Sequence, residues 1–253
     1  MKLFGVVNAS PDSLHEASIV RDEDEARARV GWLLSVGADG IDVGGQGSTF
    51  AASVVEGEAE WERVRDVLPV ALEATDLVSI DTWRPELMRR ALEVGVTVLN
   101  SADGMATTEA WEVAAEHRPL VVLPFMNGPN PHELTHVEGD PLDAMEEFFT
   151  ARLALADRYG LRDRCLLDPG TGFGPHGWEW ADRYEYQKHV YRGLGRLRRF
   201  DLPLYLPLPW KETDQHDELL EIALAADPEY GRVHHPDKVR RVESMVRTGA
   251  GRR

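Results

Sequence analysis

Short apolar runs recur along the chain, and polar residues stand at or near the ends of most of them, where a turn begins. Segments with helical periodicity separate the runs. Strands that alternate with helices favour a parallel sheet, and eight such units in 253 residues favour a single α/β fold, the (β/α)8 TIM barrel. The eight runs are residues 3–7, 40–43, 77–80, 96–99, 120–125, 165–167, 202–208 and 230–233.

The polar residues at the ends of these runs are the candidate site residues. In a parallel barrel the carboxyl ends of the strands open on one mouth, where barrel enzymes carry out their chemistry. We therefore expect residues that are scattered along the chain to converge around a shared cavity. They are Asn8, Asp42, Asp81, Asn100, Asp168, Lys211, Arg232 and His234.

The segments between the runs mix charged and apolar residues at spacings of three and four, which indicates helices. No repeat or linker interrupts them, so we expect one domain, residues 1–246, and a disordered tail, residues 247–253. A long loop, residues 126–140, follows the fifth run and is expected to overhang the mouth as a partial lid. The predicted helices are residues 22–36, 58–74, 84–94, 107–117, 141–159, 178–198 and 217–226.

The net charge of −16 argues against nucleic acid as a partner, because nucleic acid attracts basic surfaces. The same charge opposes an anionic ligand, which would need cations such as Lys211, Arg232 and His234 at the mouth. No apolar run approaches the roughly 20 residues of a membrane helix, and no signal peptide is recognisable, so we expect no membrane association and a cytoplasmic location. Cys165, the only cysteine, is expected to be buried and inert.

The most distinctive local string is LLDPGTGFGP, residues 166–175. A carboxylate at the end of a strand, followed by proline and glycines, indicates tight turns and lets the backbone approach a ligand closely. In one interpretation Asp168 only caps the turn. In the other, Asp168 accepts two hydrogen bonds from adjacent N–H groups of a planar heterocycle, because a buried carboxylate needs donors.

Six strings in order resemble those of the dihydropteroate synthase family, which belongs to the wider group of pterin-binding barrels. The resemblance covers nearly the whole chain, and each string stands at the end of a predicted strand. PWK at residues 209–211 is a poorer match, because the family has Ser-Arg-Lys there. The six strings are VVNASPDS at 6–13, GADGIDVGGQGST at 37–49, VSIDT at 78–82, LNSAD at 99–103, DPGTGFG at 168–174 and RVH at 232–234.

The resemblance implies a transferase that condenses a 6-hydroxymethyl-dihydropterin diphosphate with the arylamine 4-aminobenzoate and releases diphosphate, a step of folate biosynthesis. It also implies a homodimer, and a Mg²⁺ ion that Asn8 binds on the diphosphate. The implied pterin-binding residues are Asp81, Asn100, Asp168 and Lys211, of which Lys211 and Asp168 are also catalytic. The implied diphosphate-binding residues are Asn8, Ser48, Thr49, Arg232 and His234.

Some positions depart from the family pattern. Phe50 stands where the family has arginine, and Pro209 and Trp210 replace the serine and arginine before Lys211. In the family, the replaced residues belong to the part of the site that binds aminobenzoate and diphosphate. We therefore expect the pterin-binding part to be intact and the part that binds the second substrate to be altered. A pterin-binding paralogue without synthase activity is therefore one alternative, and a pterin-dependent corrinoid methyltransferase is another.

Two further strings have competing interpretations. HELTH at residues 132–136 has the His-Glu-x-x-His pattern of zinc peptidases, which requires both histidines on one helical face. It stands in a predicted loop, so a zinc peptidase is the remote alternative. The aromatic stretch at residues 178–191, with Trp180, Tyr184 and Tyr186, is expected to cover the barrel exterior or a subunit contact.

Overall fold

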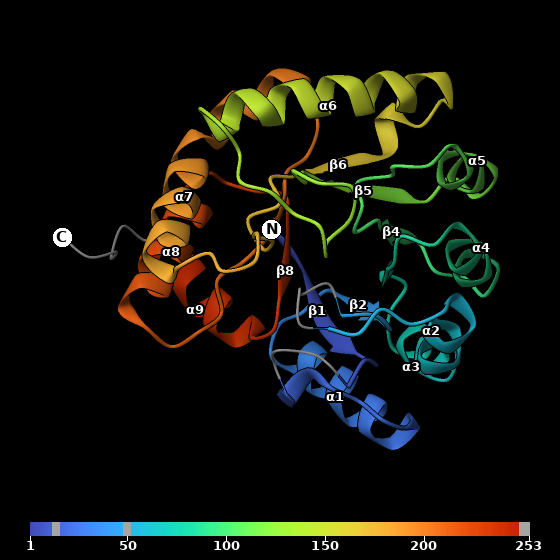
Figure 1. The fold of residues 1–253 in the computed structure, drawn as a ribbon. Coiled ribbons are helices and arrows are strands. Elements are labelled where there is room, and N and C mark those ends of the chain that lie inside the picture. Colours follow the sequence, from blue (N-terminus) through green and yellow to red (C-terminus); the bar gives the residue numbers. More distant parts are fainter. Residues whose placement is uncertain (12–15, 48–51, 248–253) are drawn as a thin grey trace.

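Parallel strands form a barrel at the centre of the computed structural model, which describes residues 1–11, 16–47 and 52–247 (Figure 1). Within these residues the eight strands follow the order β6-β5-β4-β3-β2-β1-β8-β7. A parallel bridge between Leu167 and Leu204 joins the two ends of this sheet, so the predicted TIM barrel is confirmed. The strands are β1 Lys2–Asn8, β2 Gly40–Gly44, β3 Val78–Asp81, β4 Val98–Asn100, β5 Leu120–Pro124, β6 Cys165–Asp168, β7 Tyr205–Pro207 and β8 Tyr230–Val233.

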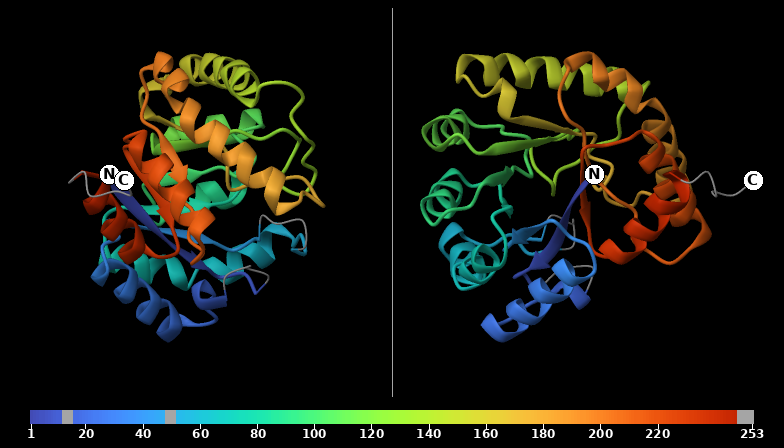
Figure 2. Two further views of the ribbon diagram at one scale, coloured as in Figure 1. Left: turned by 90° about the vertical axis from the view of Figure 1, so that its left-hand side faces the viewer. Right: turned by 180° about the vertical axis from the view of Figure 1, so that it is seen from behind.

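Helices cover the outside of the barrel on all sides, as both faces of the molecule show (Figures 1 and 2). Side-chain caps begin several of them: Asp22 accepts a hydrogen bond from the amide of Glu25, and Thr107 from that of Ala110. The helices are α1 Glu23–Ser35, α2 Gly57–Val64, α3 Val67–Ala74, α4 Pro85–Glu93, α5 Thr108–His117, α6 Pro141–Arg158, α7 Trp180–Gly193, α8 Asp214–Ala225 and α9 Pro236–Arg247, with short 3-10 segments at Glu16–Ser18, Arg162–Arg164 and Leu194–Phe200.

Three helix predictions need correction. The predicted helix 58–74 is divided into α2 and α3, because Pro69 has no amide hydrogen to donate to the carbonyl four residues earlier. The predicted helix 178–198 changes from α to 3-10 geometry after Gly193, a residue with low helix propensity. Helix α9 follows the last strand, where none was predicted. Of the predicted tail, residues 248–253 lie outside the described part of the chain.

Alternation along the strands separates two cores. Leu3 and Val7 of β1 face outward into a large cluster that the surrounding helices complete. Phe4, between them, faces the barrel interior, where its ring centroid lies 5.7 Å from that of Tyr205. This interior cluster fills the barrel below the mouth, so the inside of the barrel is a packed core. Its buried members are Phe4, Val98, Val122, Leu166 and Tyr205.

Cys165 lies on the outward face of β6 and is fully buried, as predicted. Burial raises the pKa of its thiol to about 12, so the side chain stays protonated and inert. In the described residues, no helix combines the length and the apolar character that crossing a membrane requires.

Candidate active site

Strand register places several predicted site residues at one level of the barrel. Asn8 of β1 is paired with Gly44 of β2, Gly44 with Asp81 of β3, and Asp81 with Asn100 of β4. The alternation that directs Phe4 inward directs Asn8 inward too, and Asp168 follows the interior residue Leu166 by two positions. Residues from distant parts of the sequence therefore meet at the carboxyl ends of the strands.

A cavity of about 370 Å³ opens at this mouth. Asn100 and Asp168 are buried and are not among the residues that line it; only 6% and 5% of their surfaces are exposed. The predicted pterin-binding residues thus divide between the cavity wall and the buried layer next to it. The predicted site residues on the wall are Asn8, Asp81, Lys211, Arg232 and His234.

Arg232 of β8 reaches across the barrel interior to two carboxylates. Its Nε donates to Oδ2 of Asp42 at 2.5 Å, and its Nη2 donates to Oδ2 of Asp81 at 2.9 Å. Asn100 donates to the same Asp42 oxygen at 3.4 Å. Burial opposes the charge of Arg232, but Asp42 and Asp81 outweigh it and raise its pKa above the usual value. The arginine that was predicted to bind diphosphate is thus held by an acidic pair at the base of the cavity.

Asp168 caps the turn after β6, as the simpler interpretation predicted. Its Oδ1 accepts a hydrogen bond from the amide of Gly170 at 2.7 Å. Gly170 has a φ of 67°, and a Cβ there would lie 1.9 Å from the carbonyl oxygen of Phe125. Glycine is therefore required, because the loop passes directly against the end of β5. The cap uses one lone pair of the carboxylate and leaves acceptor capacity for a ligand.

The two inward aspartates carry shifted pKa values. Burial raises the pKa of Asp168 to about 7, against smaller lowering effects of the Gly170 amide and Arg232. Burial also raises the pKa of Asp81, and the nearby carboxylates of Asp42 and Glu60 add to the effect that Arg232 opposes. Both carboxyl groups thus titrate nearer to neutral pH than exposed aspartates do, which is typical of functional sites.

Lys211 and His234 both lie close to the indole of Trp210 at the cavity wall. The Nζ of Lys211 lies 5.7 Å from the ring centroid of Trp210, and the imidazole of His234 meets that ring edge-on at 5.3 Å. The next residue, His235, lies between Trp32 at 6.0 Å and Trp210 at 6.3 Å, and unlike His234 it is not among the residues that line the cavity. The prediction that only one of the two histidines faces the mouth is consistent with this arrangement. In the described part of the chain, no carboxylate forms an ion pair with Lys211.

Helix α7 contributes a wall that the sequence did not indicate. Arg183, Gln187 and Tyr191 follow one another at four-residue spacing on the helix face that lines the cavity. Gln187 donates to the carbonyl of Thr171 at 2.6 Å, and Tyr191 to that of Pro207 at 3.0 Å, so the helix is tied to the loops after β6 and β7. The four-residue spacing of polar side chains was the available signal.

The prediction for the aromatic stretch is wrong for Trp180 and Tyr191, which line the cavity and do not cover the exterior. Trp180 stacks on His216 of α8, with ring centroids 4.4 Å apart and planes 1° from parallel. Burial and the neighbouring cations, led by Lys211, lower the pKa of His216 to about 4. The imidazole is therefore neutral at physiological pH and serves as one half of a flat stacked surface.

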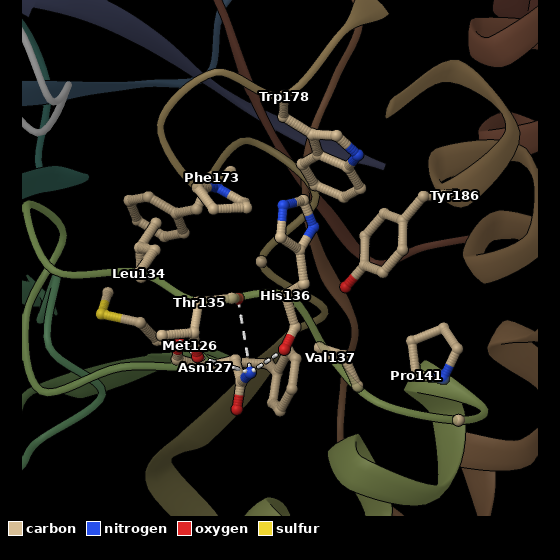
Figure 3. A pocket seen from close by; sticks show the side chains of 15 residues that line it. Met126, Asn127, Leu134, Thr135, His136, Val137, Pro141, Phe173, Trp178 and Tyr186 are labelled. Atoms are coloured by element: carbon tan, nitrogen blue, oxygen red, sulfur yellow. Dashed lines mark hydrogen bonds between the residues drawn. The ribbon is translucent and has the colours of Figure 1, made fainter. Parts of the chain in front are cut away.

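The loop at residues 126–140 does not line the main cavity, so the prediction of a lid over that cavity is not supported. Instead it forms a second, smaller pocket of about 100 Å³ with the loop after β6 (Figure 3). The rings of Phe173, Trp178 and Tyr186 line this pocket, and Asn127 holds the loop closed by donating to the carbonyl of His136 at 2.8 Å.

The HELTH string lies in this loop and has no helical structure. His132 meets the ring of Trp83 at 5.9 Å, whereas His136 meets Trp178 at 5.5 Å, so the two imidazoles face different partners. Among the residues with described positions, no group of three or more His, Cys, Asp or Glu side chains could hold a metal ion. The zinc-peptidase alternative therefore lacks its geometry.

Ser48, Thr49 and Phe50 lie outside the described residues. The predicted diphosphate contacts of Ser48 and Thr49, and the effect of Phe50, stay predictions. The neighbouring segment is anchored by Gln46, whose amide nitrogen donates to the carbonyls of Gly47 and Ser53.

Sequence comparison decides the family. A family model described as "Pterin binding enzyme" matches residues 4–207. The dihydropteroate synthase of Synechocystis sp. is 31% identical over 207 residues, which cover 80% of this chain and 69% of that protein. This chain belongs to the dihydropteroate synthase family. The Escherichia coli K12 member of the family is 29% identical over 216 residues, which cover 83% of this chain and 73% of that enzyme.

Solved dihydropteroate synthases share the barrel. The Yersinia pestis enzyme in a sulfonamide drug complex matches with a TM-score of 0.84 at 24% identity, over 99% of this chain and 94% of that one. The Xanthomonas albilineans enzyme with 4-aminobenzoic acid matches with a TM-score of 0.81 at 25% identity, over 100% of this chain and 94% of that one. The family fold thus extends past residue 207, where the sequence model stops.

Proposed function

We propose that this chain condenses a 6-hydroxymethyl-dihydropterin diphosphate with 4-aminobenzoate and releases diphosphate, as a dihydropteroate synthase in folate biosynthesis. The observation that carries the proposal is the convergence of Asp81, Asn100 and Asp168 at the ends of three strands beside one cavity. A buried carboxylate needs hydrogen-bond donors. The amide edge and exocyclic amine of a pterin supply adjacent donors, which suit these acceptors.

Each residue then has a defined task. Asp168, already oriented by the Gly170 amide, accepts hydrogen bonds from the pterin. Lys211 donates from the cavity wall to the ring oxygen and a ring nitrogen. Asp81 is held by Arg232, which orients its carboxyl group toward the cavity and favours its charged form. Asp168 and Asp81 are oriented by these partners before the substrate arrives, so the two acceptors need little reorganisation on binding.

The residues present suit a Mg²⁺ ion that enters the site bound to the substrate. Asn8 donates from Nδ2 to Ser18 at 2.6 Å, which orients its amide, and its Oδ1 lies 3.8 Å from the position of a Cβ on Gly44. Mg²⁺ keeps several waters and takes only one or two protein oxygens beside substrate phosphates. Asn8 would hold such an ion by its amide oxygen, and the bound ion would supply charge neutralisation for the diphosphate.

The protein has little covalent work to do in this reaction. Cleavage of the C–O bond to diphosphate leaves a cation at the methylene carbon that is delocalised into the pterin ring. The arylamine nitrogen then forms a C–N bond to that carbon and releases one proton to solvent. Arg232 and His234 stand on the wall where the diphosphate would leave. Positioning and charge stabilisation therefore account for the catalysis.

The proposal extends to the setting of the enzyme. We expect residues 1–246 to fold as one pterin-binding domain that acts in the cytoplasm as a homodimer. Sedimentation equilibrium of the purified protein measures its mass in solution, and a monomer at micromolar concentration would contradict the dimer.

The deciding experiment is a condensation assay with the pterin diphosphate, 4-aminobenzoate and MgCl2, in which dihydropteroate is quantified by chromatography. We expect product that requires both substrates and disappears with EDTA. Calorimetry with 6-hydroxymethylpterin monophosphate measures pterin binding separately. Tight binding of the pterin without product would identify a paralogue that lacks synthase activity. Transfer of a methyl group from a pterin donor without diphosphate would identify the methyltransferase alternative instead.

A further inference from the structure

Arg183 is a half-buried cation on the wall of the main cavity. It stands in the first turn of α7, at the mouth of the barrel, and its Nη2 donates to the carbonyl of Gly172 at 2.7 Å. Its Nε is shielded from solvent and has no hydrogen-bond acceptor within the described part of the chain. Burial lowers its pKa below the usual arginine value, and no carboxylate among the described residues offsets this effect.

The charge around Arg183 favours an anion. Lys211 lines the same cavity, and it too lacks a carboxylate partner among the residues with known positions. The nearby Lys238 differs, because Asp217 neutralises it at 2.7 Å. Arg183, Lys211 and Lys238 all act on His216, whose pKa falls to about 4. An unpaired, half-buried cation is costly, so this side of the cavity is stabilised by a negatively charged ligand.

The surface next to Arg183 suits a flat ring. Trp180, one turn earlier on α7, forms with His216 the stacked pair whose planes lie 1° from parallel. Trp210 contributes a further indole to the cavity wall. An aromatic ligand that carries a carboxylate therefore finds aromatic surfaces and a guanidinium in the same cavity.

We propose that Arg183 binds the carboxylate of the arylamine substrate, and this inference rests on the proposed function. Trp210 stands where the family has the arginine of Ser-Arg-Lys, so the loop after β7 has lost a cation. Arg183 of helix α7 supplies a cation to the cavity in its place. Gly172 holds one arm of the guanidinium fork, and the remaining donors can accept a carboxylate in bidentate geometry.

The test compares the kinetics of the native chain and of its variants with two substrates that differ only in the charge of one group. Arg183→Gln, Arg183→Lys and the native chain are assayed with 4-aminobenzoate and with its neutral analogue 4-aminobenzamide. Arg192→Gln is the matched control, because Arg192 is exposed on the same helix. We expect Arg183→Gln to raise the KM for 4-aminobenzoate by about 10- to 100-fold, as loss of a hydrogen bond to a charged group does. The kinetics with 4-aminobenzamide should stay within about twofold.

Equilibrium binding completes the test. Calorimetry with 4-aminobenzoate, in the presence of pterin and diphosphate, should show the same 10- to 100-fold loss for Arg183→Gln, a smaller loss for Arg183→Lys and none for Arg192→Gln. Affinity for 6-hydroxymethylpterin monophosphate and the Tm should not change. Equal losses for the acid and the amide, or weaker binding of pterin phosphate or diphosphate, would overturn the assignment of Arg183.

The proposed function and the proposed role of Arg183 are contradicted by different results. Failure of the proposed function appears as absence of dihydropteroate from the native chain. If the native chain makes dihydropteroate and Arg183→Gln retains the native preference for the acid over the amide, only the role of Arg183 is wrong. If the native chain binds no 4-aminobenzoate at all, both proposals are overturned.

Discussion

Arg232 and Asp42 form an ion pair at 2.5 Å across 190 positions of sequence, and this pair joins the last strand of the barrel to the second. Asp42 is fully buried. The second arm of Arg232 binds Asp81, which is one of the predicted pterin contacts. The same guanidinium therefore serves the stability of the barrel and the charge of the site.

Replacing Arg232 should unfold the protein more readily. Arg232→Met leaves Asp42 and Asp81 without their cation, and breaking a buried pair from one side costs about 3–5 kcal/mol. Asp42→Asn in the same chain should restore part of the loss. Urea unfolding measures the change. Arg27→Met is the control, because Arg27 pairs with Glu23 on the surface, where solvent screens the pair and its loss should hardly change the stability. Equal losses at the two arginines would contradict a structural role.

Asp168→Asn should weaken pterin binding and leave the stability of the fold unchanged. The asparagine oxygen can still accept the hydrogen bond from Gly170, so the turn and the Tm should be retained. The negative charge that receives the pterin N–H groups is lost, which should weaken binding by about 10- to 100-fold. Calorimetry with 6-hydroxymethylpterin monophosphate measures this loss. Unchanged affinity would place Asp168 outside the pterin pocket.

Pterin affinity should increase with pH. Because burial raises the pKa of Asp168 to about 7, the carboxyl group is mostly protonated below that pH and ionised above it. A pterin that donates to the ionised form must displace the proton, so affinity should rise up to about tenfold per pH unit below pH 7 and level off above it. Calorimetry between pH 5.5 and 8.5 measures the trend, and Asp168→Asn should flatten it. Affinity that falls with pH would refute the assignment.

Asp168 should also make the free energy of unfolding depend on pH, and this free energy should decrease with rising pH, whereas pterin affinity increases. The native protein retains the proton on Asp168 up to about pH 7, whereas an unfolded aspartate releases it near 3.8. The free energy of unfolding that Asp168 contributes therefore decreases as pH rises between these values. Urea unfolding of the native chain and of Asp168→Asn across this range isolates the contribution. An increase specific to the native chain would contradict the raised pKa.

Gly170→Ala should distort the loop that carries the Asp168 turn. The left-handed φ of 67° costs an alanine about 1–2 kcal/mol, and the added Cβ would collide with the carbonyl of Phe125. Both unfolding free energy and pterin affinity should fall. Gly31→Ala is the control, because a Cβ in this exposed position of α1 meets nothing within 4 Å. That change should stabilise the helix by up to about 1 kcal/mol, and a similar gain at Gly170 would refute the strain argument.

Local sequence patterns predicted the barrel well. Apolar runs with polar ends located the strands. Because the carboxyl ends of the strands of a parallel barrel open on one mouth, the same runs predicted that residues such as Asn8, Asp81 and Arg232 meet at one cavity. The single proline that separates α2 from α3 was visible in the sequence, yet the helical periodicity of the segment concealed its effect.

Contacts across the barrel were not predictable in the same way. Nothing local to Arg183 indicates that its helix face looks into the cavity, since the tilt of α7 depends on packing against the loops after β6 and β7. The loop at residues 126–140 had the length of a lid, but its position over a separate pocket depends on the aromatic residues that it meets there.

The amino-acid sequence by itself determined the eight strands, the polar residues at their ends and the family, because these depend on local periodicity and on strings of neighbouring residues. Only the tertiary structure decided the partners of the charged groups: Arg232 with Asp42 and Asp81, and Arg183 with no carboxylate among the described residues. The physical reason is that electrostatic interactions and burial depend on distance through space, which barrel closure sets independently of separation along the chain.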